Sequence, residues 1–259
     1  MKIGAWNVNS INARLPTVLK VLKELDLDVA CLQEIKCVAE KFPRQELEEL
    51  GYNCAVQGQK SYNGVAILSK HPIEDVLEGL PGDPDDDQAR YLEATISAET
   101  PVRVASIYLP NGNPRPGPKY AYKLAWMDRL IEHAKDRLAR EEPLVLAGDY
   151  NCIPLDQDCW DAAVWAEDAL AFPDTRAKFR QLQWLGLTEA YAAIDGRAHE
   201  YTFWDYQAGA WPKDHGVRID HLLLSPHAAD GLERISIHRD ARAMEKPSDH
   251  VPVYGEFRF

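Results

Sequence analysis

The sequence predicts a mixed α/β sandwich built from 259 residues. Short apolar segments typical of buried strands recur along the whole chain, whereas few segments have the length and periodicity of helices. The strands mostly follow one another across short turns, without the regular strand–helix alternation of a parallel sheet. No repeat, low-complexity linker or break in composition divides the chain, so we expect a single domain over residues 1–259.

The first half of the chain is expected to be rich in strands. Residues 2–8 read as a strand, with Asn9 or Ser10 as the expected cap of a following helix. The apolar residues of that helix recur at helical spacing, at positions 15, 18, 19, 22 and 25. Residues 44–50 also look helical. Further strands are expected over residues 29–32, 54–56, 65–68, 91–96 and 102–109.

The second half is expected to contain a long amphipathic helix followed by an irregular region. Apolar residues at 124, 127, 130, 131, 134 and 138 share one helical face. Residues 144–147 form a strand, and residues 150–200 are irregular apart from a helix at about 176–185. The last strands are expected at 202–206, 219–224, 235–238 and 251–257.

Composition restricts the class of protein. No stretch approaches the roughly 20 apolar residues that a membrane span requires, and the N-terminus lacks the layout of a signal peptide. Five cysteines without a Cys-x-x-Cys pair indicate reduced thiols, so we expect a cytoplasmic protein. The net charge of −12 counts against nucleic acid as a partner but does not exclude it, because a metal site needs carboxylates and basic residues can cluster locally.

Polar side chains stand where four apolar runs end. They lie in the fragments Trp6–Asn9, Leu32–Glu34, Gly148–Asn151 and Ser248–His250. A carboxylate or carboxamide at the end of a buried strand sits on rigid backbone, where a hard metal ion and a reacting phosphate are usually held. Asp and Asn also end strands as simple turn formers, so each fragment alone has a structural explanation. Together the four fragments favour a metal-assisted hydrolase.

These side chains can supply the parts that phosphodiester hydrolysis requires. A site must neutralise the charge of the phosphate, orient a water, remove its proton and help the leaving oxygen. Glu34 offers an oxygen ligand to Mg²⁺, and Asn7 can hold a metal-bound water or steady Glu34. Asp149 and Asn151 point to the same side of an extended chain, so one can act as base on a water that the other orients. His250 is the expected proton carrier or cationic phosphate donor.

Two further residues complete this hypothesis. Asp220 suits the role of fixing the tautomer of His250, although an ion pair with Arg218 is the alternative. Tyr108 ends an apolar run and can touch the phosphate or the leaving group; a core-edge aromatic is the alternative. The residues by themselves therefore predict a metal-dependent phosphoesterase of unspecified substrate.

The same residues resemble the exodeoxyribonuclease III family of apurinic/apyrimidinic endonucleases, from residue 1 to about 257. The matching fragments are Trp6–Ser10, Leu32–Glu34, Tyr108–Gly112, Gly148–Asn151, Tyr201–Tyr206, Arg218–His221 and Glu245–His250. Tyr201–Tyr206 and Glu245–His250 separate this branch from the rest of the endonuclease/exonuclease/phosphatase superfamily. The resemblance implies a four-layered sandwich of the deoxyribonuclease I type, with two packed mixed β-sheets flanked by helices.

The resemblance also implies a Mg²⁺-dependent DNA repair enzyme in which Mn²⁺ can substitute. Such enzymes act on double-stranded DNA, where they cut the phosphodiester 5′ to an abasic site and trim the duplex from its 3′ ends. They also remove 3′ phosphates and other 3′ blocking groups. We expect the chain to act as a monomer, away from membranes.

By this resemblance, Glu34 is the main metal ligand, and Asn7 and Asp249 assist it. Asp149 and Asn151 complete the set of residues around the ion.

The resemblance assigns chemical roles as well. Asp149 prepares the attacking water, and Asn151 orients that water or the phosphate. His250, held by Asp220, contacts the scissile phosphate, as does Tyr108, which alternatively assists the leaving 3′ oxygen. The base is either Asp149 or His250.

The family's contacts with DNA map onto a further set of residues. Arg90 and Asn111 match positions that contact DNA phosphates, and Lys119 and Lys123 extend this footprint. Trp211 either stacks near the DNA or anchors its loop.

A flipped abasic sugar needs an apolar slot too small for a base. Phe203, Val217 and Ile219 match the slot positions of the family.

Two other classes of function compete with a repair nuclease. One is another phosphoesterase of the superfamily, acting on lipid or inositol phosphates; the fragments Tyr201–Tyr206 and Glu245–His250 argue against it. The other is a non-catalytic nucleic-acid-binding regulator, against which the full set of catalytic residues argues.

Overall fold

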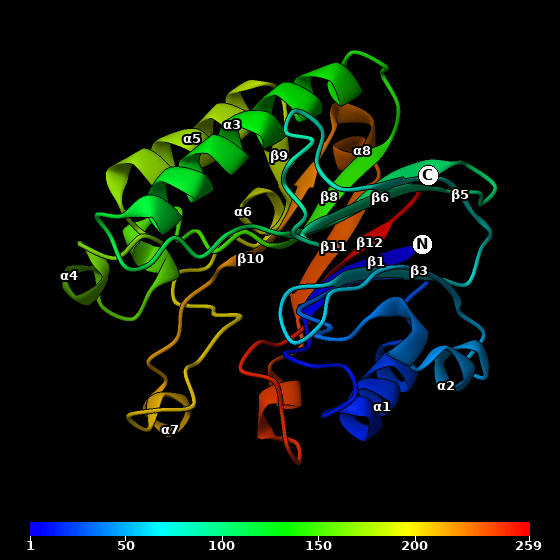
Figure 1. Cartoon of the computed structure of the whole chain (residues 1–259), viewed down its shortest axis with the longest axis horizontal. Coiled ribbons are helices and arrows are strands. Elements are labelled where there is room, and N and C mark those ends of the chain that lie inside the picture. The colour runs from blue at the N-terminus through cyan, green and yellow to red at the C-terminus, as the bar shows by residue number, and fades with distance from the viewer.

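Two six-stranded β-sheets pack face to face in the computed structural model, which describes residues 1–259 (Figure 1). The first sheet consists of β1 (Lys2–Asn7), β2 (Val29–Gln33), β3 (Asn53–Gln57), β4 (Val65–Ser69), β11 (Leu232–Ile237) and β12 (Val253–Phe257). The second consists of β5 (Ile73–Glu78), β6 (Tyr91–Ile96), β7 (Val102–Tyr108), β8 (Leu144–Asp149), β9 (Thr188–Glu189) and β10 (Asp220–Leu224). The strand orders are β11-β12-β1-β2-β4-β3 and β5-β6-β7-β8-β10-β9. Both sheets are mixed, because β1 with β2 and β7 with β8 are parallel pairs among antiparallel ones.

Helices cover the outer face of each sheet, so the predicted four-layered sandwich is confirmed (Figure 1). The first sheet is covered by α1 (Leu15–Leu25) and α2 (Arg44–Glu48), and the second by α3 (Pro118–Leu138) and α5 (Pro173–Trp184). The shorter helices are α4 (Ala162–Trp165), α6 (Ala190–Ile194), α7 (Ala210–Lys213) and α8 (Pro226–Asp230). Three 3₁₀ turns are η1 (Ala39–Lys41), η2 (Asp156–Asp158) and η3 (Arg239–Ala243). None of the helices combines the length and the apolar character that crossing a bilayer requires.

Alternating side chains explain the layers. In β2, Val29 and Cys31 face the second sheet, whereas Ala30 and Leu32 pack against α1. Successive side chains of a strand point to opposite faces, so a strand covered on both faces is apolar throughout. Burying each Val or Leu side chain stabilises the fold by about 1.5–3 kcal/mol. The unbroken apolar runs in the sequence therefore mark the central strands of this sandwich.

The structure corrects two of the predicted elements. Residues 202–206 do not form a strand; Phe203 makes only isolated β-bridges, with Val217 and His250. This segment crosses the rim between the ends of the sheets, where no neighbouring strand continues the pairing. Asn9 and Ser10 do not cap α1, which begins only at Leu15. They have positive φ angles of 44° and 86° and turn the chain at the rim.

Strand direction brings the polar ends together. Because β1 and β2 are parallel, as are β7 and β8, Asn7, Tyr108 and Asp149 all lie at the carboxyl ends of strands. Asp149 pairs in register with Tyr108 of β7 on one side and with Asp220, the first residue of antiparallel β10, on the other. The two sheets thus present their polar strand ends to one shared rim.

Candidate active site

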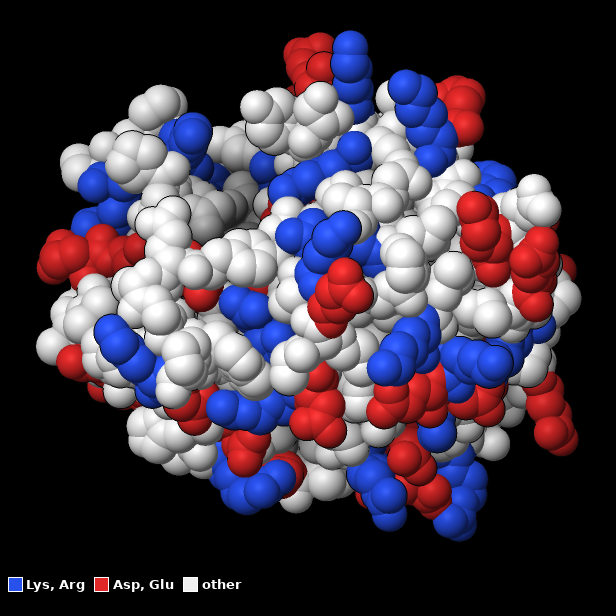
Figure 2. Space-filling model, turned by 90° about the horizontal axis from the view of Figure 1, so that it is seen from below, with Lys and Arg blue, Asp and Glu red and all other residues white.

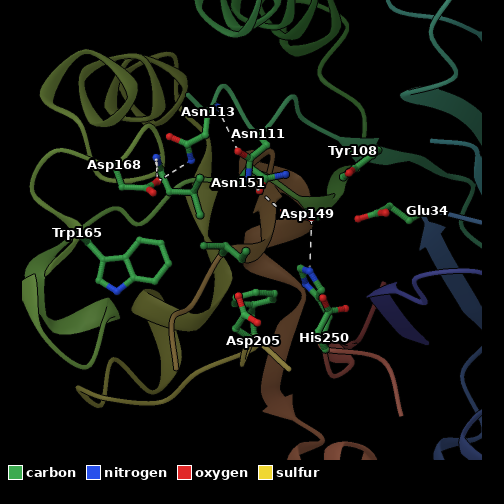
Figure 3. Close-up of a pocket in the computed structure, with 14 residues that line it drawn as sticks. Glu34, Tyr108, Asn111, Asn113, Asp149, Asn151, Trp165, Asp168, Asp205 and His250 are labelled. Carbon is green, nitrogen blue, oxygen red and sulfur yellow. Dashed lines mark hydrogen bonds and ion pairs between the residues drawn. The ribbon is translucent and has the colours of Figure 1, made fainter. Parts of the chain in front are cut away.

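A cleft of about 300 Å³ opens at this rim and is lined by 14 residues from distant parts of the chain. Figure 3 shows Glu34 and Tyr108 on one side of the cleft, Trp165 on the opposite side, and Asp149 and His250 between them. The structure therefore brings side chains from both ends and the middle of the chain into one site.

His250 is held between two carboxylates. Its Nδ1 lies 2.9 Å from Oδ2 of Asp220, and its Nε2 lies 3.8 Å from Oδ2 of Asp149. Its backbone is fixed by Trp6, whose indole nitrogen donates to the carbonyl of His250 at 3.0 Å. Burial lowers the pKa of His250, but the charges of Asp220 and Asp149 outweigh this effect and raise the pKa above its ordinary value. The imidazole is therefore a cation at neutral pH.

Asp149 is buried beside the pair formed by His250 and Asp220. Burial raises its pKa; the charge of His250 opposes the rise, and the charge of Asp220 adds to it, so that the net direction is upward. Its oxygens accept hydrogen bonds from the backbone N–H of Asn151 at 2.8 Å and from the amide of Asn7 at 3.0 Å. Interacting groups of this kind titrate as a set. Asp149 is thus suited to take up a proton near neutral pH.

Asn7 links the two carboxylates of the cleft. Its amide nitrogen donates to Oε1 of Glu34 at 2.9 Å as well as to Oδ2 of Asp149 at 3.0 Å. Burial raises the pKa of Glu34, but hydrogen bonds from Asn7 and Lys36 and the charge of Lys36 lower the pKa overall. Glu34 is therefore ionised at neutral pH. The hydrogen bond from Asn7 steadies its carboxylate, which is one of the two roles predicted for Asn7.

The residues present fit a hard divalent cation. Glu34 and Asp249 both line the cleft, and carboxylate oxygens are the ligands that Mg²⁺ prefers. Asp149, Asp220 and His250 form a second possible cluster, with ligand atoms within 4.8 Å of one another. In that cluster both ring nitrogens of His250 face carboxylates, which favours the protonated ring, and a protonated ring cannot bind metal. Glu34 is the better metal ligand.

Tyr108 and three predicted DNA contacts lie beside this centre. Burial, with the nearby charges of Glu34 and Asp149, raises the pKa of Tyr108 well above its ordinary value, so its hydroxyl remains a donor. The guanidinium of Arg90 lies 4.8 Å from the centre of the Tyr108 ring. Arg90, Asn111 and Lys119 line an adjoining cavity of about 310 Å³.

Lys123 is not a surface contact, so its predicted role in binding DNA phosphates is wrong. The side chain is fully buried. Its ammonium donates to the backbone carbonyls of Asn111 at 3.0 Å and of Asn151 at 2.6 Å. Helical spacing explains this position, because Lys123 lies on the face of α3 that also carries Met127 and Leu130.

The apolar wall of the cleft includes residues that the sequence did not reveal. Of the three residues predicted to form the slot, Phe203 and Ile219 line the cleft. Val217 does not; it is fully buried and pairs with Phe203. Trp165 and Leu170 also line the cleft, and they come from a region of the sequence that showed no regular pattern.

Trp211 packs against Trp204 and against the 3₁₀ turn η3. Its ring meets that of Trp204 edge-on at 4.8 Å, and the guanidinium of Arg239 lies 5.0 Å from its centre. Of the two roles predicted for Trp211, these contacts favour the second, in which it anchors its loop. The prediction also missed three polar residues that line the cleft, namely Asn113, Asp168 and Asp205. The amide of Asn113 donates to Asp168 at 3.0 Å across the upper edge of the cleft (Figure 3).

Fold and cleft together define a phosphoesterase. The chain belongs to the Endonuclease/Exonuclease/phosphatase family, whose model matches residues 4–250. Within this family it belongs to the exonuclease III/AP endonuclease branch, and it is a DNA repair nuclease of that type. The exodeoxyribonuclease III of Haemophilus influenzae is 31% identical over 267 residues, with both chains covered in full. The exodeoxyribonuclease of Bacillus subtilis is 30% identical, with 98% of each chain covered.

Solved structures agree with this placement. The 3′ phosphatase NExo from Neisseria, bound to a product DNA hairpin, superposes with a TM-score of 0.96 at 41% identity over the whole of both chains. An AP endonuclease from Archaeoglobus fulgidus superposes with a TM-score of 0.95 at 33% identity, again over both whole chains. The predicted family and enzyme class are confirmed.

Proposed function

We propose that this enzyme hydrolyses phosphate esters in damaged double-stranded DNA with the help of Mg²⁺ or Mn²⁺. It cuts 5′ to abasic sites, and it removes phosphates, other blocking groups and nucleotides from 3′ ends. The observation that carries this proposal is the His250 imidazolium, held by Asp220 and Asp149 in the same cleft as the ionised Glu34. Similarity to a 3′ phosphatase and to an AP endonuclease supports both substrate classes.

The geometry favours Asp149 over His250 as the base. Glu34, assisted by Asn7 and Asp249, would hold a divalent ion, and that ion would supply positive charge to offset the charge of the phosphate. His250 is already protonated, so it acts as a donor to the phosphate oxygens. Asp149, whose raised pKa suits proton uptake, removes the proton of the attacking water. This water is oriented by Asn151.

Tyr108 lies on the same side of the cleft as Glu34 and supplies a further hydrogen-bond donor. Its hydroxyl keeps its proton at neutral pH and is positioned to donate a hydrogen bond to the phosphate or to the leaving oxygen. A donor at this point stabilises the negative charge that develops as the ester bond breaks.

DNA binds across the face that carries the cleft. Although the net charge is −12, lysines and arginines gather around the middle of the face in Figure 2. Arg90 and Lys119 line the cavity next to the active site. The apolar wall of Phe203 and Ile219 accepts a sugar that lacks its base, whereas a base needs more room.

One substrate tests the whole proposal. It is a labelled duplex that carries an abasic analogue in one strand and a 3′-phosphate at a nick in the other. We expect Mg²⁺ to support cleavage 5′ to the analogue and release of the 3′-phosphate, EDTA to stop both reactions, and Asp149→Asn to abolish both. Turnover of sphingomyelin or an inositol phosphate without DNA cleavage would instead favour another branch of the family. DNA binding without Mg²⁺-dependent cleavage would indicate a regulator.

A further inference from the structure

Lys36 carries a charge that the proposed mechanism does not use. Its Nζ lies 2.8 Å from Oε2 of Glu34 and 2.5 Å from Oδ1 of Asn9. The amide nitrogen of Asn9 donates in turn to Oδ1 of Asp249 at 3.0 Å. The ammonium is thus bound by carboxylate and carboxamide oxygens, the ligands that a hard divalent cation also prefers.

Backbone hydrogen bonds hold Glu34 and Lys36 in place at the rim. Glu34 and Lys36 have positive φ angles of 50° and 53°, which residues other than glycine seldom adopt. Ile35 between them is fully buried, and its N–H donates to the carbonyl of Gly64 at 3.1 Å. On the other side, the N–H of Ser10 donates to the carbonyl of Glu34 at 2.7 Å. Such conformations persist where the surroundings hold them, often at functional sites.

We infer that Lys36 competes with the divalent cation for Glu34 and thereby sets the metal affinity of the enzyme. The inference rests on the proposed function, because it takes Glu34 as the main metal ligand. An ammonium at hydrogen-bonding distance from a carboxylate repels a divalent ion on that same carboxylate. The ion is therefore bound more weakly than Glu34 and its neighbours alone would bind it.

Lys36 also affects the charge that the ion presents to DNA. It neutralises Glu34, so the bound ion keeps more of its positive charge for the phosphate oxygens. Removing the ammonium has effects of opposite sign: metal binding becomes tighter, and the chemical step at saturating metal becomes slower. A side chain that merely supported the fold would not produce this combination.

The test is Mn²⁺ binding to the DNA-free protein, followed by the electron paramagnetic resonance signal of free Mn²⁺. Lys36→Met keeps the length of the side chain and removes its charge. We expect the Kd for Mn²⁺ to fall about tenfold or more, while kcat on the abasic duplex at saturating Mn²⁺ decreases. Lys36→Arg keeps the charge, so its Kd stays within about threefold of the wild-type value.

Two controls separate the inference from the proposed function. Lys70→Met removes a lysine that is equally exposed, at 27%, and is paired with Asp26 at 2.6 Å, so its Kd is unchanged. Glu34→Gln weakens Mn²⁺ binding if the ion binds where we propose. Equal or weaker binding by Lys36→Met, together with a clear loss in Glu34→Gln, overturns the inference alone. Unchanged binding in Glu34→Gln overturns both the metal assignment and the inference.

Discussion

Replacing Asp220 by Asn tests the assignment of His250 as a charged phosphate donor. Oδ2 of Asp220 lies 2.9 Å from Nδ1 of His250, and Asn keeps the shape and one oxygen while it removes the charge. Two opposite unit charges about 4 Å apart attract each other by about 4 kcal/mol at an effective dielectric constant of 20. This energy corresponds to a difference of about three in pKa.

The direction of the change follows from the surroundings of His250. Burial alone lowers the pKa of this buried imidazole. In Asp220→Asn, Asp149 at 3.8 Å from Nε2 and the charge of Asp249, the last and smallest of the causes, still favour the cation. We therefore expect the pKa of His250 to move from above its ordinary value to near or below neutrality. Because a lower pKa means that the proton is lost at lower pH, activity that requires the imidazolium is lost as pH rises.

The assay is the pH dependence of kcat on the abasic duplex, together with an NMR titration of isotope-labelled histidine. The contribution of His250 to the wild-type rate should persist above neutral pH. Asp220→Asn should lose activity as pH rises through the neutral range and be slower by about 10²–10⁴ at pH 8. As a control, Asp128→Asn removes an exposed carboxylate of α3 and should keep the wild-type profile. An Asp220→Asn enzyme with an unchanged profile and an unchanged His250 titration would refute the reasoning.

The remaining predictions concern residues around the cleft. Asp149→Asn should lower kcat by about 10³ or more while the Kd for DNA, measured without metal, stays close to wild type, because it removes the base and not a binding contact; an active variant would exclude Asp149 as the base. Lys119→Met should raise KM and reduce the slope of the logarithm of the DNA-binding constant against the logarithm of salt concentration by about one. Fluorescence anisotropy at a series of salt concentrations measures this slope. Lys123→Met should instead lower kcat with little change in the salt dependence, because its ammonium holds the carbonyls of Asn111 and Asn151; equal effects of the two lysines would contradict their different burial.

Much of the site could be predicted because its residues follow buried strands. Glu34 and Asp149 come directly at the ends of apolar runs, and parallel strands deliver such ends to one rim. The pairing of Asp220 with His250 was also predicted from chemical type, since a carboxylate commonly fixes the tautomer of an imidazole that transfers protons.

Other features could not be predicted because they depend on neighbours distant in sequence. Residues 202–206 have the composition of a strand, but no adjacent strand continues the pairing at the rim. Val217 is apolar like a wall residue, and only packing shows that it lies behind Phe203. Trp165 enters the wall from a short helix that carries no periodic signal.

The amino-acid sequence by itself predicted the class of fold and many of the polar side chains that line the cleft, because strand periodicity and side-chain chemistry are local properties. The tertiary structure alone decided which way Lys36 and Lys123 point. One ammonium lies against the carboxylate of Glu34 at the rim, and the other is buried beneath Asn151. Both are ordinary lysines in the chain, and the direction in which each points depends on the oxygens that the fold brings within reach.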